Sequence, residues 1–175
     1  MTNEDRQYEA KVNEIVMDFL KSATPLQRHQ LVAEWNHDSG YDVFNCIVDD
    51  PETDKATALM MYWTSGGGSN YTYENREDML ARSSWDRERF DLIEKLEAKY
   101  MAGFYKNHQF AYDPTADRGY DWVEEWADEQ KREMPAAMLT KLDGAQVEFE
   151  AGWIEGVPSY VHEKISQAYK EIFGG

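Results

Sequence analysis

Positive charge is scarce in this sequence. Eighteen lysine and arginine residues stand against 34 aspartate and glutamate residues, which gives a formal net charge of −16. A surface this negative repels phosphate backbones and anionic lipid headgroups. We therefore expect no nucleic-acid partner and no binding to a membrane surface. The charge favours a basic protein as partner, although acidity can also serve solubility alone.

Cysteine and long hydrophobic runs are scarce as well. Cys46 is the only cysteine, so an internal disulfide and a multi-cysteine metal site are excluded. It lies in the run V-F-N-C-I-V, where we expect a small buried side chain rather than a nucleophile. No apolar run approaches the roughly 18 residues that span a bilayer. The N-terminus, M-T-N-E-D-R-Q-Y-E-A, lacks the basic and apolar regions of a signal peptide, and the sequence predicts a cytoplasmic protein.

Motifs of catalytic, metal and cofactor sites are also missing. The histidines form no H-x-x-x-H or H-E-x-x-H pair, and Glu-x-x-His occurs once, at Glu34–His37, where a di-metal carboxylate site needs two copies. The run Gly66-Gly67-Gly68 lacks the lysine of a phosphate-binding loop, and we interpret it as a flexible helix terminus. We expect no catalytic residue, no metal and no cofactor. A less favoured alternative is a small hydrolase with a site near Asp38, Tyr41, His108 and Asp113.

Core-forming residues are abundant, and their spacing is helical. The 175 residues are 42% hydrophobic and 14% aromatic, which is ample for one buried core. Helical periodicity or capping signals mark the segments 3–21, 25–35, 56–66, 84–105, 120–132, 135–142 and 159–173. Residues 41–48 fit a buried strand or a short helix, and a helix paired with 56–66 is the simpler interpretation. We predict a mainly α fold, a single-domain bundle of about seven to eight helices over residues 1–175. Alternation at 147–151 allows a short β-hairpin near residues 146–155.

The acidic excess is concentrated toward the two ends of the chain. Residues 1–50 carry ten acids and four bases, residues 51–112 ten and eight, and residues 113–175 fourteen and six. If the two ends pack side by side, they form one acidic face.

The segment 120–132, Y-D-W-V-E-E-W-A-D-E-Q-K-R, combines acidic and aromatic residues at helical spacing. Its two tryptophans fit a core position under a solvated face, or they anchor a partner that the acids attract. The predicted partner-binding residues are Asp117, Tyr120, Asp121, Trp122, Glu124, Glu125, Trp126, Asp128 and Glu129.

The stretch from Trp35 to Trp63 resembles an uncharacterised bacterial family, domain of unknown function 4274. The motifs that carry this resemblance are W-N-H-D-S-G-Y, D-D-P and T-A-L-M-M-Y-W. Shorter motifs extend it: G-F-Y at 103–105, Y-D-P at 112–114 and G-Y-D-W at 119–122. No activity is attached to this family, so the resemblance implies no catalytic residue or ligand.

In size and charge the chain is similar to the immunity proteins that accompany secreted bacterial toxins. This analogy predicts a protein that binds and neutralises a cognate toxin, a basic protein domain, by occluding its active site or its substrate surface. An interaction protein with a structural or regulatory role and no toxin is the alternative.

Overall fold

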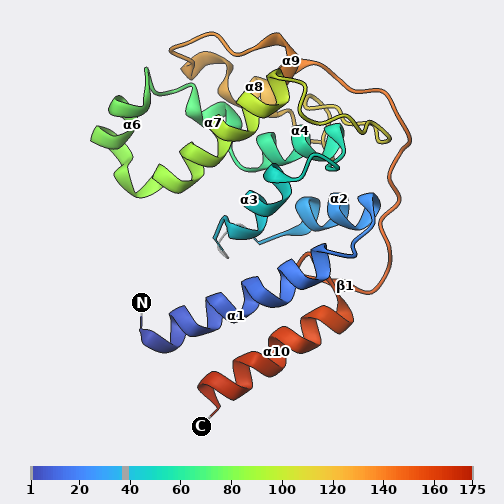
Figure 1. Ribbon diagram of the computed structural model, residues 1–175. Coiled ribbons are helices and arrows are strands. Elements are labelled where there is room, and N and C mark those ends of the chain that lie inside the picture. Colours follow the sequence, from blue (N-terminus) through green and yellow to red (C-terminus); the bar gives the residue numbers. More distant parts are fainter. Residues whose placement is uncertain (1, 37–39, 175) are drawn as a thin grey trace. The chain divides into compact units, whose positions relative to one another are not determined.

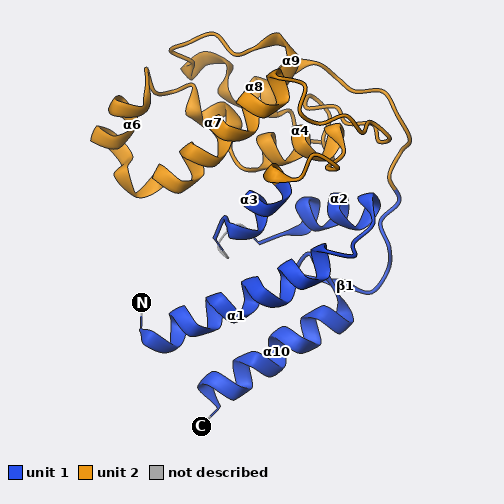
Figure 2. Cartoon of the chain, in the orientation of Figure 1, with its two compact units in different colours: residues 1–47, 148–175 blue, residues 48–147 orange. Residues whose placement is uncertain are grey.

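The chain divides into two compact units, shown in Figure 2. The computed structural model describes residues 2–36 and 40–174. Unit 1 comprises residues 1–47 and 148–175, and unit 2 comprises residues 48–147. The structure is mainly helical with one small hairpin, which confirms the predicted fold class. The single domain stays a prediction, because compactness alone does not decide whether the units fold independently.

Unit 1 is built on two long helices that lie side by side, α1 (Asn3–Leu20) and α10 (Ser159–Phe173), as Figure 1 shows. It also contains α2 (Pro25–Glu34), most of α3 (Asp42–Asp49), and the antiparallel pair β1 (Trp153–Ile154) and β2 (Val157–Pro158). Capping boxes begin both α1 and α2, because Thr2 pairs with Asp5 and Thr24 pairs with Gln27. The predicted start of α2 at Thr24-Pro25 is confirmed.

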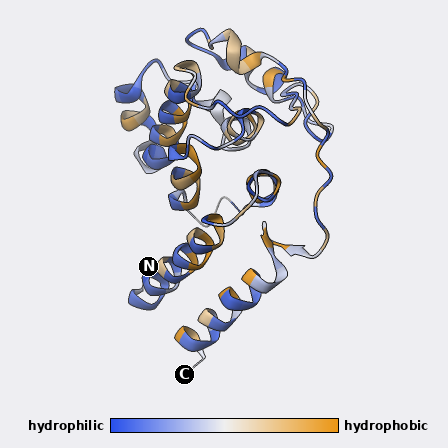
Figure 3. Cartoon of the chain, turned by 45° about the vertical axis from the view of Figure 1, so that its right-hand side comes forward, coloured by the Kyte–Doolittle hydropathy of each residue, from blue (hydrophilic) through white to orange (hydrophobic). Residues whose placement is uncertain are grey.

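Aromatic edges hold α10 against α1. The Tyr8 ring meets the ring of Tyr169 at 5.5 Å between centroids and that of Phe173 at 5.7 Å. Nearer the hairpin, the buried Phe19 ring contacts Trp153 at 5.9 Å and Tyr160 at 6.4 Å. Edge-to-face pairs of this kind contribute beyond the area they bury. Figure 3 shows hydrophobic and hydrophilic residues interleaved along both helices, as expected of amphipathic surface helices.

The predicted short hairpin is present, with its first strand inside the predicted region at Trp153–Ile154 and its second strand beyond it at Val157–Pro158. The alternating segment 147–151 forms no strand; Glu150 instead exchanges two hydrogen bonds with Gln30 of α2, at 3.0 Å and 2.8 Å. The turn at Glu155-Gly156, with φ of 50° and 80°, joins β1 to β2. Two residues with positive φ make the turn that matches strand twist, and this backbone requirement places the hairpin there.

Unit 2 surrounds a helix that is buried on all sides, α4 (Lys55–Thr64). Every residue from 56 to 63 is buried, and the Trp63 indole N–H donates to the Met138 carbonyl at 2.9 Å. The remaining helices are α5 (Gly67–Asn70), α6 (Arg76–Ser83), α7 (Arg87–Met101), α8 (Trp122–Trp126) and α9 (Ala136–Leu139), with 3₁₀ turns η2 (Ser84–Asp86) and η3 (Ala127–Glu129). The Asp54 side chain caps α4 by accepting from the Ala56 backbone N–H at 2.9 Å.

The glycine run is packed rather than flexible. Gly66, at φ 82°, reverses the chain after α4, and Gly67 and Gly68 are buried in α5. A Cβ on Gly67 would stand 2.3 Å from the Tyr62 ring, and one on Gly68 would stand 2.3 Å from the Trp126 ring. The run therefore follows the end of a helix, as predicted, with Gly66 in the left-handed conformation. Gly67 and Gly68, however, are glycine for lack of space and not for flexibility.

Several predicted helix limits differ from the structure. The helix predicted at 84–105 is preceded by α6, capped by Asn75, which the sequence analysis missed, and α7 ends at Met101. The helix predicted at 120–132 is reduced to the five residues of α8 and the turn η3, and the one at 135–142 is reduced to α9. Tertiary packing of short segments overrides their helical pattern here.

Cys46 is exposed, which overturns the expectation of a buried side chain. It lies on α3, where Val43, Phe44, Ile47 and Val48 are buried and form the inner face. Position 46 falls on the opposite side because the helical period sets which residues of an apolar run turn inward.

Candidate functional site

Four carboxylates of α8 and η3 form the acidic ridge: Glu124, Glu125, Asp128 and Glu129. All four side chains are exposed. Asp121 belongs to the same segment but has a structural task, because its side chain caps α8 by accepting from the backbone N–H groups of Val123 and Glu124 at 3.0 Å and 2.9 Å. The ridge therefore contains the acids of the predicted site that face solvent.

A rigid turn precedes the ridge and is held by Asp117. This side chain is only 7% exposed and accepts hydrogen bonds from the Trp122 indole at 2.8 Å and the Tyr112 hydroxyl at 3.2 Å, besides pairing with Arg118. The Asp117 carboxylate is therefore already paired with groups of the protein itself. The burial of Tyr112 and its contact with Asp117 raise the pKa of the Tyr112 hydroxyl far above its ordinary value.

Tyr120 is the exposed aromatic residue of the predicted site. Its side chain is 44% exposed and its ring lies 4.4 Å from the Trp122 ring, so the two form a fixed pair beside the ridge. A hydrogen bond to Glu125 raises the pKa of the Tyr120 hydroxyl. A rigid tyrosine with a polar tip is typical of partner anchors, because little side-chain entropy is lost on binding.

Trp126 serves the fold of unit 2 instead. Its ring lies directly against Gly68 of α5, as the missing space for a Cβ at that glycine shows. The two tryptophans therefore have different surroundings. Trp126 packs against α5, as expected of a core position, whereas Trp122 packs against the exposed Tyr120.

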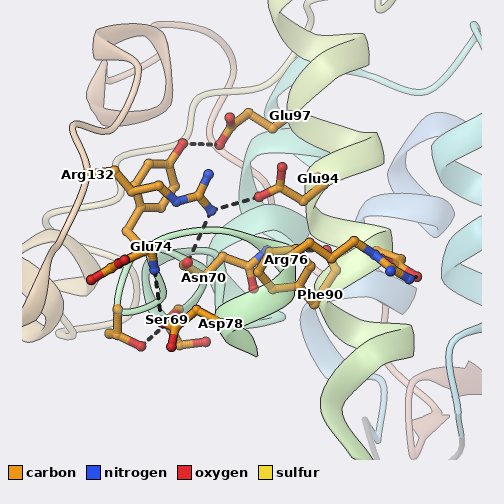
Figure 4. A network of polar contacts seen from close by, with 12 residues as sticks. Ser69, Asn70, Glu74, Arg76, Asp78, Phe90, Glu94, Glu97 and Arg132 are labelled. Carbon is orange, nitrogen blue, oxygen red and sulfur yellow. Dashed lines mark hydrogen bonds and ion pairs between the residues drawn. The ribbon is translucent and has the colours of Figure 1, made fainter. Parts of the chain in front are cut away.

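The nearest cations in the sequence do not neutralise the ridge. Lys131 lies 3.6 Å from Asp78, and Arg132 pairs with Glu94 at 2.8 Å. Figure 4 shows Arg132 reaching across to Glu94 and to the Asn70 backbone carbonyl, which it contacts at 3.1 Å. Both cations therefore pair with carboxylates of the body of unit 2 and not with those of the ridge.

Beside Arg132, a buried tyrosine pair converges on one carboxylate. The hydroxyls of Tyr62 and Tyr71 both donate to Glu97, at 3.1 Å and 2.7 Å, and the Arg132 guanidinium lies 4.5 Å from the centre of the Tyr71 ring. Burial raises the pKa of both tyrosines far above the ordinary value, and Glu97 adds to the effect. The shared carboxylate satisfies two buried hydroxyls at once, which fits a role in stability.

The residues of the alternative hydrolase site differ in their surroundings, and Tyr41 is half-buried. Asp38 and His37 lie outside the described residues. Asp113 accepts from both the backbone N–H and the hydroxyl of Thr115 and pairs with Lys141, while His108 is exposed.

A cavity in unit 1 was missed by the sequence analysis. It has a volume of about 490 Å³ and lies between α1, the end of α2, the β-turn and α10. Its apolar lining includes Val12, Trp35, Val157 and Ile165. Its charged and polar lining includes Asp5, Tyr8, Glu9, Asn36, Glu155 and His162. These residues come from three distant parts of the sequence, so no local motif indicates that they line one cavity.

One further residue outside the predictions is notable. Trp85, in η2, is 83% exposed, the highest exposure among the large hydrophobic side chains described.

Within the described residues, no three or more histidine, cysteine or acidic side chains are grouped so that they could hold a metal ion. Likewise, no described helix combines the length and the apolar character needed to cross a membrane.

Comparison with known proteins identifies one region. Residues 23–101 match the family described as "Domain of unknown function (DUF4274)", which confirms the resemblance carried by Trp35–Trp63. The matched region runs from the cap of α2 to the end of α7, whereas the motifs at 103–105, 112–114 and 119–122 and the acidic ridge lie outside it. No curated protein and no solved structure matches the chain. The likeness to the DUF4274 family therefore extends over residues 23–101, which is a little under half of the chain.

Proposed function

We propose that this protein is a cytoplasmic binding protein for a positively charged protein domain, and that it acts as an immunity protein that neutralises a bacterial toxin. The observation that carries the proposal is the acidic ridge: four exposed carboxylates, uncompensated by Lys131 or Arg132, next to the rigid pair Tyr120–Trp122. Charge attracts the partner and the aromatic pair supplies buried contact area.

The chemistry of the ridge favours recognition by electrostatic steering. Exposed carboxylates raise the local concentration of a basic partner and increase the association rate, an effect that salt screens over about 8–10 Å. Tyr120 then contributes the desolvated contact that slows dissociation, because aromatic anchors dominate interface energies. A ridge of negative charge also resembles a polyanion, which suits a toxin that acts on nucleic acid or a nucleotide.

Growth rescue tests this function. The protein is co-expressed with the product of the gene adjacent to its own, and we expect wild type to restore growth that the neighbour's product arrests. The triple variant Glu124→Lys, Glu125→Lys, Asp128→Lys should lose rescue, because like charges now face the partner. A circular dichroism melt checks that the variant is folded.

The matched control is Asp143→Lys, Glu148→Lys, Glu163→Lys, which changes the net charge equally at three exposed acids that do not belong to the ridge. We expect this control to rescue growth like wild type. Equal rescue by the ridge variant shows that the ridge is not the binding face. Binding without any growth effect points to the regulatory alternative rather than to an immunity protein.

A further inference from the structure

The cavity of unit 1 contains a buried donor that the protein leaves unused. Trp35 lines this cavity and is 7% exposed, yet its indole Nε1 has no hydrogen-bond partner among the described residues. A buried N–H without an acceptor is destabilising, so such groups are rare unless a water or a ligand supplies the acceptor.

The rim of the same cavity is negative. Asp5, Glu9 and Glu155 contribute carboxylates, and the described lining contains no lysine or arginine. Asp5 is partly engaged, because it accepts from the Thr2 backbone N–H at 2.6 Å, whereas Glu9 is exposed. His162 lies 3.8 Å from Glu155. Burial raises the pKa of the Tyr8 hydroxyl, and the charge of Glu155 raises it further, which shows the sign of the local field.

Glu155 occupies a backbone position that disfavours it. Its φ of 50° is left-handed, the conformation that asparagine and glycine adopt most readily in a two-residue hairpin turn. A glutamate held there at a cost in strain fits a functional use of its carboxylate at the cavity.

We propose that this cavity binds a guanidinium or alkylammonium group on an apolar stem, with a carbonyl oxygen beside the stem that accepts from the Trp35 indole. The carboxylates of Glu9 and Glu155 hold the cation, the Tyr8 ring offers a surface over which it can pack, and Val12, Val157 and Ile165 surround the stem. The volume of about 490 Å³ lies within the range of small-molecule sites. This site is independent of the acidic ridge and of the partner proposed for it.

Nuclear magnetic resonance of the ¹⁵N-labelled full chain tests the proposal with two probes. Nα-acetyl-arginine amide carries the cation and the carbonyl, and Nα-acetyl-citrulline amide has nearly the same shape without the charge. The Trp35 indole resonance is assigned as the peak that Trp35→Phe removes. We expect the arginine probe to shift this peak and to bind about tenfold more tightly than the citrulline probe, since charge-assisted bonds carry the difference.

Variants locate the site. Glu9→Gln and Glu155→Asn should each weaken the arginine probe by about fivefold or more, while Glu163→Gln, an exposed acid of α10 outside the cavity lining, should leave its affinity unchanged. Glu155→Asn should also raise the melting temperature, because asparagine accepts the left-handed turn more readily. A gain in stability together with a loss of binding separates function from folding.

Agmatine, which has the guanidinium without the carbonyl, distinguishes the two sources of such a cation. Tighter binding of the arginine amide supports the contact between the ligand carbonyl and the Trp35 indole and indicates an arginine borne by a peptide. Tighter binding of agmatine indicates a free amine and overturns the contact with Trp35. Equal affinity for the arginine and citrulline probes overturns the proposal, as does binding that leaves the Trp35 indole peak unshifted.

Discussion

Helix α4 of unit 2 and helix α1 of unit 1 are buried to different extents. In unit 2, α4 is enclosed on every side, its residues 56–63 are all buried, and glycines at 67 and 68 allow rings to pack against α5. In unit 1, α1 is longer but buries only Val16, Phe19 and Leu20, and it flanks an open cavity. The enclosed helix favours stability, whereas the half-exposed pair α1 and α10 leaves surface for recognition.

This difference separates two kinds of acidic residue. Around the core of unit 2, carboxylates such as Glu97 and Asp86 bind tyrosine hydroxyls or arginine and serve the fold. The acids of the ridge and of the cavity rim face solvent or open space. The overall charge of −16 therefore includes both structural and available carboxylates, and only their contacts distinguish them.

The largest expected effect compares the two environments by truncation. Leu59→Ala on α4 removes a side chain with no exposed surface, and we expect a loss of about 3 kcal/mol in the free energy of unfolding. Val12→Ala on α1 shortens a half-buried side chain beside an existing cavity and should cost less than about 1 kcal/mol. Urea denaturation measures both. Equal losses would contradict the distinction between the units.

The second prediction concerns the glycines of α5. Gly68→Ala places a Cβ 2.3 Å from the Trp126 ring, so the ring must move, and we expect a loss of about 2 kcal/mol. Gly119→Ala is the control: it meets no atom within 4 Å and tests only the cost of positive φ, about 1 kcal/mol. Wild-type stability of Gly68→Ala would mean that Trp126 does not lie on α5.

The smallest expected effect is a loss of stability at acidic pH. Lys95 and Lys99 lower the pKa of Asp49, and Arg76 lowers that of Asp91. Their stabilising contribution is therefore present above the unfolded value of about 3.8 and is lost as pH falls through the lower folded values. Each pair is exposed, so we expect less than about 1 kcal/mol apiece.

Thermal melts of wild type and Asp49→Asn between pH 6 and pH 3 measure the stabilisation that the ion pairs of Asp49 contribute. The difference between the two proteins should shrink as the pH falls below the ordinary aspartate pKa, and added salt should reduce it at neutral pH. A difference that grows on acidification runs against the pairing of Asp49 with Lys95 and Lys99.

Local signals in the sequence predicted much of the scaffold. The helices predicted from residue 25, from residue 56 and over 159–173 each depend on signals within one or two turns, and all three are confirmed. The helix at 120–132 failed because its pattern competes with tertiary contacts: Trp126 packs on α5 and Asp117 fixes the preceding turn. Short amphipathic segments lack the length to enforce their own helix.

The candidate sites show the same limit. The acids of the ridge follow one another in the sequence, so composition pointed to them directly. The cavity brings together residues near positions 5–12, 35 and 155–165, whose proximity depends on α10 returning beside α1. The sequence pattern predicts neither the missing hydrogen-bond partner of the Trp35 indole nor the left-handed backbone conformation of Glu155.

The most direct test of the proposed function is the salt dependence of association. Stopped-flow or surface plasmon resonance measures the association rate of wild type and of the ridge variant Glu124→Lys, Glu125→Lys, Asp128→Lys with the product of the neighbouring gene. We predict that the wild-type rate falls steeply as salt increases and that the variant is slow with little salt dependence. A wild-type rate that does not respond to salt, or a variant that associates as fast as wild type, contradicts recognition of a basic protein by this ridge.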